Sequence, residues 1–198
     1  RIRKVNAKSG IITTVAGSGE QSFAGDDRPA TTASLNYPTS VAIDAVGSLF
    51  IADTLNHRVR KVNAATGIIT TAAGNGEAGF SGDNGQAASA SLNTPMAVAV
   101  DAAGNLFIAD SQNHRIRRVA AANGVITTVA GNGLPNYDYG EGYPAIYASL
   151  SEPGGLTIDR DGILYIADTS HNTVRGVNAQ GFIITIAGTG FASFCGDG

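Results

Sequence analysis

A T-x-A-G motif recurs along the chain at a constant spacing, and this spacing constrains the fold more than any other feature. The alanines of its four copies are 57 residues apart, at Ala16, Ala73, Ala130 and Ala187. A fixed period of this order indicates a repeat protein, in which each unit buries its apolar faces only against its neighbours. The chain has 26 Gly and 6 Pro and only 15 % charged residues, which suits short strands joined by turns.

Each period contains four strand signals in the same order. Alternating residues in each segment are apolar, and turn residues such as Gly47, which tolerates positive φ, separate the segments. A linker rich in Gly, Asp, Ser and Ala then leads to the next unit at Pro95. Four short antiparallel strands joined by a longer crossing describe a β-propeller blade, so the predicted fold class is all-β. In the first complete unit the predicted strands are Thr39–Asp44, Ser48–Asp53, His57–Asn63 and Gly67–Gly74.

The first complete unit reads P-x-x-V-A-I-D-x-x-G-x-L-F-I-A-D-x-x-N-H-R-V-R-K-V, which resembles the NHL repeat. Arg58 and Arg115 stand where that repeat has Leu. The linker FSGDNGQAASASLNTP is similar to those of bacterial and teneurin-like members. The third unit departs from the pattern, with HNT at His171–Thr173 and NYDYGEGYPAIY in its linker. The resemblance implies a six-bladed propeller.

The chain holds about three and a half blades of such a ring. It opens on the third strand of a blade, which needs two inner strands that these residues do not contain. We expect the remaining blades to come from the same protein or from a second chain, with the first source favoured. The predicted partial propeller, 1–198, divides into an outer half-blade 1–17, blades 38–74, 95–131 and 153–188, and the start of a linker at 189–198.

The charge of the chain is nearly balanced. There are 13 basic and 16 acidic residues, a net charge of −3, so no overall field favours nucleic acid or an anionic membrane. No apolar run is long enough for a membrane span, and no targeting segment is expected. The single cysteine, Cys195, has no partner for a disulfide and leaves the redox compartment open.

Most basic residues lie in the third strands, where stacked blades would align them. The resemblance permits an RNA-binding stripe, but no aromatic residue interleaves these strands. We favour ion pairs between the arginines and the aspartates that recur with them. Asp44, Asp101 and Asp159 also suit the capping of a strand end before a glycine turn. The other three recurrent aspartates are Asp53, Asp110 and Asp168.

No metal, cofactor or catalytic residue is predicted. His57, His114 and His171 recur one blade apart and are too far from one another to share an ion, so we expect each to stabilise its turn by a hydrogen bond. The linker acids Asp26, Asp27, Asp83 and Asp197 allow a calcium interpretation, but each loop offers only one or two of them. We favour linkers anchored by Phe23, Phe80 and Phe194, with Gly-Asp making the turn.

One linker differs from its counterparts in a way that repetition does not explain. It contains four tyrosines and two acids and is one residue longer than the others. Tyrosine combines a flat apolar face with a hydroxyl at low entropic cost, as at many recognition surfaces. Drift, with some tyrosines covering a neighbouring blade, is the alternative. The predicted ligand-binding residues are Tyr137, Asp138, Tyr139, Glu141, Tyr143 and Tyr147.

The favoured function is a noncatalytic binding or scaffold module that presents rim loops to a protein or glycan partner. By resemblance we expect it outside a bacterial cell, at the surface or beyond it. The alternative is a fragment of a metal-dependent propeller lyase or hydrolase with its active site in the central channel. In that case most metal ligands would lie in blades outside this chain.

Overall fold

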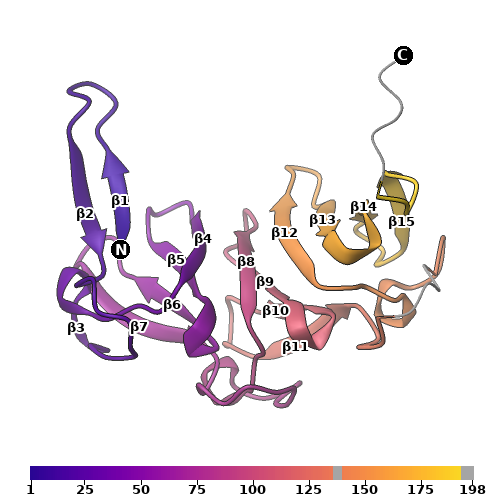
Figure 1. Cartoon of the computed structure of the whole chain (residues 1–198), viewed down its shortest axis with the longest axis horizontal. Coiled ribbons are helices and arrows are strands. Elements are labelled where there is room, and N and C mark those ends of the chain that lie inside the picture. The colour runs from indigo at the N-terminus through magenta and orange to yellow at the C-terminus, as the bar shows by residue number, and fades with distance from the viewer. Residues whose placement is uncertain (136–139, 193–198) are drawn as a thin grey trace.

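The computed structural model describes residues 1–135 and 140–192. Its sheets follow one another around an arc, as the predicted propeller requires (Figure 1). The half-blade consists of β1 (Ile2–Val5) and β2 (Ile12–Ala16). Blade 1 consists of β4 (Pro38–Ile43), β5 (Leu49–Asp53), β6 (Arg58–Val62) and β7 (Ile68–Ala73), with the short β3 (Arg28–Pro29) on its outer edge.

Two further blades repeat this antiparallel order. Blade 2 is β8 (Pro95–Val100), β9 (Leu106–Asp110), β10 (Arg115–Val119) and β11 (Ile126–Ala130). Blade 3 is β12 (Pro153–Ile158), β13 (Leu164–Asp168), β14 (Thr173–Val177) and β15 (Ile183–Ala187). The predicted all-β fold of four-stranded antiparallel blades is therefore confirmed. No helix among the described residues is long and apolar enough to cross a membrane.

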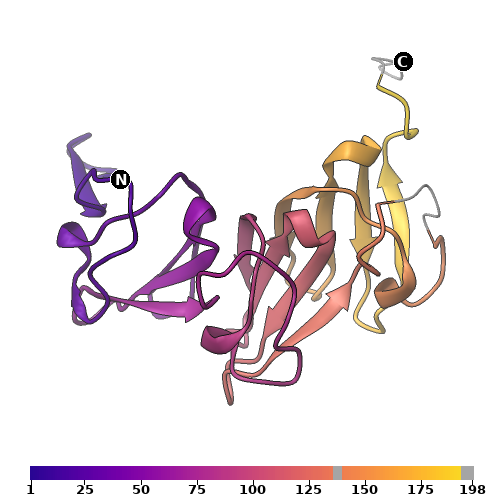
Figure 2. The same cartoon turned by 60° about the horizontal axis from the view of Figure 1, so that its bottom comes forward.

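The core lies between blades rather than inside them, because each sheet is thin and both of its faces are apolar. Between blades 1 and 2, Phe50 and Ala52 meet Val98 and Ile108. The same arrangement recurs between blades 2 and 3. Successive sheets lie face to face in both views of the molecule (Figures 1 and 2). Because neighbouring units hide each other's apolar area, the array is stabilised mainly through these interfaces.

The turn between the second and third strands keeps one geometry in all three blades. Each is a single 3-10 turn, and the residue after it has a left-handed backbone: φ is 51° at His57, 54° at His114 and 55° at Asn172. The third repeat has exchanged the order of His and Asn without changing this turn. The 3-10 turns are η2 (Thr54–Asn56), η4 (Ser111–Asn113) and η6 (Thr169–His171).

Each linker covers the outer edge of the blade that follows it. Arg28 and Pro29 pair with β7, and bridges join Gln86 to Val125 and Pro144 to Phe182. Such cover keeps an outer strand from exposing its backbone to other chains. A short 3-10 turn lies in each linker, at η1 (Ala30–Thr32), η3 (Ala87–Ser89) and η5 (Ala145–Tyr147).

The two ends of the arc expose faces that are buried elsewhere in the molecule. Ile12 is 52 % exposed, whereas its counterparts Ile69, Ile126 and Ile183 are fully buried. At the other end, Val174 is 36 % exposed, while its counterpart Ile116 is fully buried against blade 3. Six blades in a closed ring stay a prediction.

Candidate functional site

The described part of the tyrosine-rich linker carries an exposed apolar surface. Tyr143 and Tyr147 are 66 % and 69 % exposed, and Ile146 between them is 44 % exposed. Leu134, earlier in the same linker, is also exposed. We call these four residues the rim patch. Tyr137, Asp138 and Tyr139, which the sequence also marks as binding residues, lie outside the described residues.

Neighbouring hydrogen bonds bring the two parts of the rim patch together. The Nδ2 of Asn132 donates to the carbonyl of Tyr147 at 3.0 Å. The Oδ1 of the same side chain accepts from the backbone N–H of Leu134 at 2.8 Å. The side-chain amide of Asn132 therefore bonds to both chain segments. Sequence reasoning did not include Leu134 or Ile146, although the contrast with the other linkers was available.

The other two linkers fold in the same way but carry different residues at the positions of the rim patch. Tyr143, Ile146 and Tyr147 occupy positions where those linkers have short, polar or charged residues. Leu134 stands where both have Glu, so at these four positions the linker before blade 3 differs from the other two in carrying large apolar groups. The counterparts are Arg28, Thr31, Thr32 and Glu20 in the first linker and Gly85, Ala88, Ser89 and Glu77 in the second.

The backbone beneath the rim patch is tied to two blades. Gly131 and Asn132 follow the last strand of blade 2. Their backbone N–H groups donate to the carbonyls of Ala145 and Ala148, respectively, both at 2.9 Å. The N–H of Ala145 donates to Gly181 beside blade 3 at 2.8 Å. Ala145, Ala148 and Leu150 are buried in the core between these blades. The exposed side chains therefore project from an ordered segment, which lowers the entropic cost of binding.

Glu141 has a structural partner on blade 3. Its carboxylate pairs with the guanidinium of Arg175 at 3.0 Å and accepts the backbone N–H of Thr185 at 2.9 Å. Asp26 and Asp83 bind Arg60 and Arg117 in the same way. The side chain of Glu141 is half exposed. Whether this acid also contacts a ligand stays a prediction.

The arginine pairing that the sequence favours is present with half of the predicted acids. Arg60 bonds Asp53 at 3.3 Å and Arg117 bonds Asp110 at 3.2 Å, with both arginine side chains fully buried. The equivalent Arg175 to Asp168 distance is 3.8 Å. The predicted partners Asp44, Asp101 and Asp159 instead accept backbone N–H groups in the turns after the first strands. For these three, the capping interpretation is the correct one.

The aromatic anchors of the first two linkers stack on a second arginine of the third strands. The guanidinium of Arg58 is 4.0 Å from the ring centre of Phe23, and that of Arg115 is 3.9 Å from Phe80. These contacts explain why the third strands of blades 1 and 2 each carry arginines two residues apart, whereas blade 3 has Thr173 at the stacking position. One arginine binds acids in the interior, while the other stacks on the linker. Phe194 lies outside the described residues.

The histidines of blades 1 and 2 bond the next blade rather than their own turn. The Nδ1 of His57 accepts the N–H of Thr94 at 3.1 Å, and that of His114 accepts the N–H of Glu152 at 3.2 Å. Burial lowers the pKa of both rings below the ordinary value of 6.5. His171 is different, because its Nδ1 lies 2.8 Å from the carboxylate of Asp168, the place that Asn56 and Asn113 fill in the other blades.

Among residues 1–135 and 140–192 there is no group of three acidic, His or Cys side chains able to hold a metal ion. Asp26 and Asp83, considered above as calcium ligands, are engaged with arginines. Asp27 lies in a left-handed turn with φ at 61°. Asp197 is outside the described residues.

Comparison with protein families assigns the repeat. A model of the teneurin NHL domain matches residues 74–137 and 135–193. The chain belongs to this NHL-repeat family. Among curated proteins, this NHL chain is 30 % identical over 189 residues to NHL repeat-containing protein 2 of Bos taurus, covering 90 % of the chain and 26 % of that protein. It is 38 % identical over 97 residues to Teneurin-4 of Homo sapiens, covering 43 % of the chain and 4 % of that protein.

A third relative is the protein SUPPRESSOR OF QUENCHING 1, chloroplastic, of Arabidopsis thaliana, 29 % identical over 186 residues, covering 90 % of the chain and 17 % of that protein. The NHL chain thus spans about a quarter or less of the length of these relatives.

Solved structures support the propeller fold. A structural genomics protein of unknown function from Bacteroides thetaiotaomicron aligns with a TM-score of 0.65 at 20 % identity, covering 91 % of the NHL chain and 40 % of the other. A gluconolactonase from Xanthomonas campestris aligns with a TM-score of 0.57 at 16 % identity, covering 94 % and 55 %. At these identities the likeness concerns the fold alone.

Proposed function

We propose that this NHL module is a noncatalytic binding scaffold that presents the rim patch to a partner. The observation that carries the proposal is the contrast between equivalent linkers. Tyr143, Ile146 and Tyr147 are large and exposed at positions where the other linkers have small, polar or charged residues. Since the underlying fold is shared, folding alone does not require these side chains there. Clusters of exposed apolar groups on a rigid rim are typical of interaction sites.

Of the two expected partner classes, the composition of the rim patch favours a protein. Tyrosine anchors are common to protein and glycan recognition, but Ile146 and Leu134 add aliphatic surface that a polar glycan does not match. The proposal includes an extracellular location, which rests on the family resemblance alone.

The test compares the binding of Tyr143→Ala and Tyr147→Ala with that of Phe191→Ala. Phe191, an aromatic residue that follows blade 3, is 79 % exposed and serves as the matched control. Peptide display and a glycan array are screened with the wild-type chain, and hits are remeasured with each variant. We expect peptide hits that lose about tenfold or more affinity in the two rim variants and none in the control. Equal binding by all four proteins would remove the rim patch from the proposal.

The metal-dependent lyase or hydrolase alternative is tested separately. Metal analysis of the purified chain and of a longer protein that contains it would find stoichiometric zinc or calcium if the alternative holds. In that case the channel, and not the rim patch, would be the functional site.

A further inference from the structure

An arginine at the start of the third strand fits into a narrow space beside the T-x-A-G motif. In blade 1 the guanidinium of Arg58 donates to the carbonyls of Gly74 and Asn75. One side of it lies 4.0 Å from the ring centre of Phe23. On the other side, a Cβ at Gly76 would lie 2.5 Å from its Nη2, so only a glycine leaves room for it. We call the space beside this glycine and these carbonyls the arginine slot.

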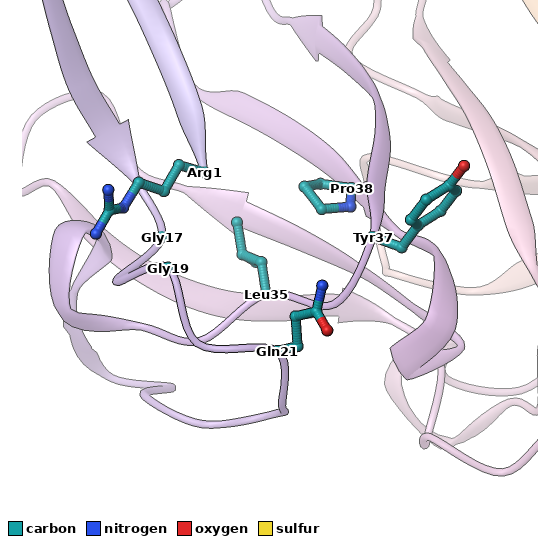
Figure 3. Close-up of a pocket in the computed structure, with 7 residues that line it drawn as sticks. All are labelled: Arg1, Gly17, Gly19, Gln21, Leu35, Tyr37 and Pro38. Carbon is teal, nitrogen blue, oxygen red and sulfur yellow. The ribbon is translucent and has the colours of Figure 1, made fainter.

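The arginine slot is filled in the same way in two other repeats. In blade 2, Arg115 donates to the carbonyl of Asn132 at 2.9 Å and lies against the corresponding glycine. In the half-blade, Arg1 donates through Nε to the carbonyl of Ser18 at 3.0 Å. Figure 3 shows the guanidinium of Arg1 beside Gly19, where a Cβ would meet it. The slot is therefore a regular feature of the repeat.

Blade 3 keeps the backbone of the arginine slot but has Thr173 in place of the arginine. Thr173 lies opposite Asp168 in the sheet register, as Arg115 lies opposite the corresponding aspartate of blade 2. Gly188 and Gly190 have φ at 90° and 85°, and their counterparts in blade 2 have φ at 90° and 86°. The slot is thus preserved in blade 3, while the side chain at its base is much shorter.

Two polar groups at the slot of blade 3 have no partner in the part of the chain that the structure describes. Thr173 is 8 % exposed, and its buried Oγ1 makes no hydrogen bond there. The carbonyl of Thr189 is the counterpart of the arginine acceptors at Asn75 and Asn132. Among residues 1–135 and 140–192 no group donates to it. Because buried polar groups are nearly always bonded, the hydroxyl of Thr173 indicates that a donor is missing.

The charges around the slot indicate that the missing donor is a cation. In blade 2 two arginines accompany two carboxylates. These are Arg115, Arg117, Asp83 and Asp110. In blade 3, Arg175 alone accompanies the carboxylates of Glu141 and Asp168. His171 lies 2.8 Å from Asp168 but adds a positive charge only when it is protonated. The described residues of blade 3 therefore have one permanent cation for two carboxylates.

We propose that the arginine slot of blade 3 binds an arginine side chain of a protein partner. The guanidinium of that arginine donates to the carbonyl of Thr189 and to Oγ1 of Thr173, and it lies against Gly190. It also supplies the second cation of the charge cluster. An arginine is favoured over a lysine because the other slots of this chain hold a planar guanidinium with donors in fixed directions.

The slot is accessible to a side chain that comes from outside the molecule. Arg58 and Arg115, which fill the slots of blades 1 and 2, are themselves partly exposed. The slot therefore opens at the surface, and an arginine can enter it without unfolding of the blade. This site is separate from the rim patch and does not depend on the proposed role of that patch.

The first test is a titration of the 198-residue chain, labelled with ¹⁵N, with N-acetyl-arginine methylamide. Amide signals of Thr173, Thr189 and Gly190 report binding. The citrulline and lysine analogues are the matched probes, because the first is neutral with almost the same shape and the second carries its charge on an ammonium group. We expect saturable shifts with the arginine compound and about tenfold or weaker binding of the other two. No saturable shift, or equal affinity for all three compounds, would overturn the proposal.

The second test places an arginine in the slot by mutation. Thr173→Arg should abolish the saturable shifts of Thr189 and Gly190 and raise Tm by about 3 °C, because the chain then fills its own slot. Thr157→Arg is the control: it adds the same charge at an exposed position of β12 and should titrate as wild type. Binding by Thr173→Arg as strong as that of wild type would contradict the proposal.

The reciprocal variant Arg115→Thr gives blade 2 the residue that blade 3 has. It should create a second site, so the amide signals of Asn132 and Gly133 should now shift with N-acetyl-arginine methylamide and not with the citrulline analogue. The same signals should stay unchanged in the wild-type chain, where Arg115 fills the slot. A folded Arg115→Thr variant whose signals do not respond would show that the slot does not accept a guanidinium from outside.

Discussion

Each buried arginine of a third strand bonds both to the linker and to the second strand of its own blade. Arg117 bonds Asp110 inside the blade and Asp83 from the linker, and it also donates to the carbonyl of Ser81 at 3.0 Å. Burial raises the pKa of Asp110, while hydrogen bonds from Asn113 and from the backbone of Asn93, together with Arg117, favour its charged form. The arginine is thus the cation that makes a buried carboxylate tolerable.

Arg117→Met should therefore destabilise the chain by about 3 kcal/mol, because it leaves the carboxylate of Asp110 without its cation. Removing the cation raises the pKa of the Asp110 carboxyl further. Above that pKa the buried carboxylate is charged and lowers the stability of the folded chain. At lower pH the carboxyl is protonated, so part of the lost stability returns. Urea unfolding at pH 7 and pH 5 measures both effects. The control Arg118→Met, on the same strand but partly exposed, should change stability by about 0.5 kcal/mol or less. Equal losses in the two variants would contradict this role for Arg117.

The histidines that join blades predict a loss of stability in acid. His57 and His114 accept backbone N–H groups and must be neutral to do so. Their pKa values are lower in the folded chain than the ordinary 6.5, so the unfolded chain binds more protons as pH falls below 6.5. The stability from these contacts is present above 6.5 and is lost as pH falls toward the folded pKa values. The double variant His57→Gln/His114→Gln should show a smaller decrease in Tm than wild type between pH 7 and pH 5.

At the scale of the element, each blade closes on a glycine that no other residue replaces easily. Gly131 has φ at 90°, and a Cβ there would lie 2.3 Å from the carbonyl oxygen of His114. Gly74 and Gly188 have the same surroundings in their blades. This close approach lets the end of the fourth strand pass against the start of the third. It explains the glycine of the T-x-A-G motif.

Gly131→Ala should cost roughly 3 kcal/mol, because left-handed strain adds to a backbone clash that has no flexible side chain to relieve it. Gly162→Ala is the matched control: its φ is 80° and a Cβ there would meet nothing within 4 Å. It should cost about 1 kcal/mol from backbone strain alone. Thermal unfolding of the two variants measures the difference. A loss at Gly162 as large as that at Gly131 would show that the contact with His114 is unimportant.

At the scale of the whole molecule, stability resides in the interfaces between blades. Ile166 is fully buried between blades 2 and 3, and Ile184 is 49 % exposed on the outer face of blade 3. Ile166→Ala should cost about 3 kcal/mol, and Ile184→Ala less than about 1 kcal/mol. Chemical denaturation of both variants tests this. Similar losses of stability in the two variants would show that the face of blade 3 that carries Ile184 is covered in solution.

Much of this architecture could be predicted from the sequence, because every repeat contains the same local pattern of strand and turn residues. Alternating residues, glycine turns and the constant period predict the strands, their antiparallel order and their stacking into blades. The tyrosine-rich linker also stood out, since a departure from a repeat is visible without coordinates. Its aliphatic members Leu134 and Ile146 were missed because neither is unusual by itself. The structure places them in the rim patch because both side chains are exposed.

The tertiary structure decided which polar groups meet. Asp44 and Asp53 both recur with the arginines, but only Asp53 lies on the adjacent strand, opposite Arg58 and on the same face as Arg60. The linker acids and the histidines meet partners 34 to 45 residues away or in the next blade. The sequence by itself determined strands and period, because these depend on neighbours along the chain. Ion pairs depend on how sheets stack around an axis, which brings together residues that no local pattern links.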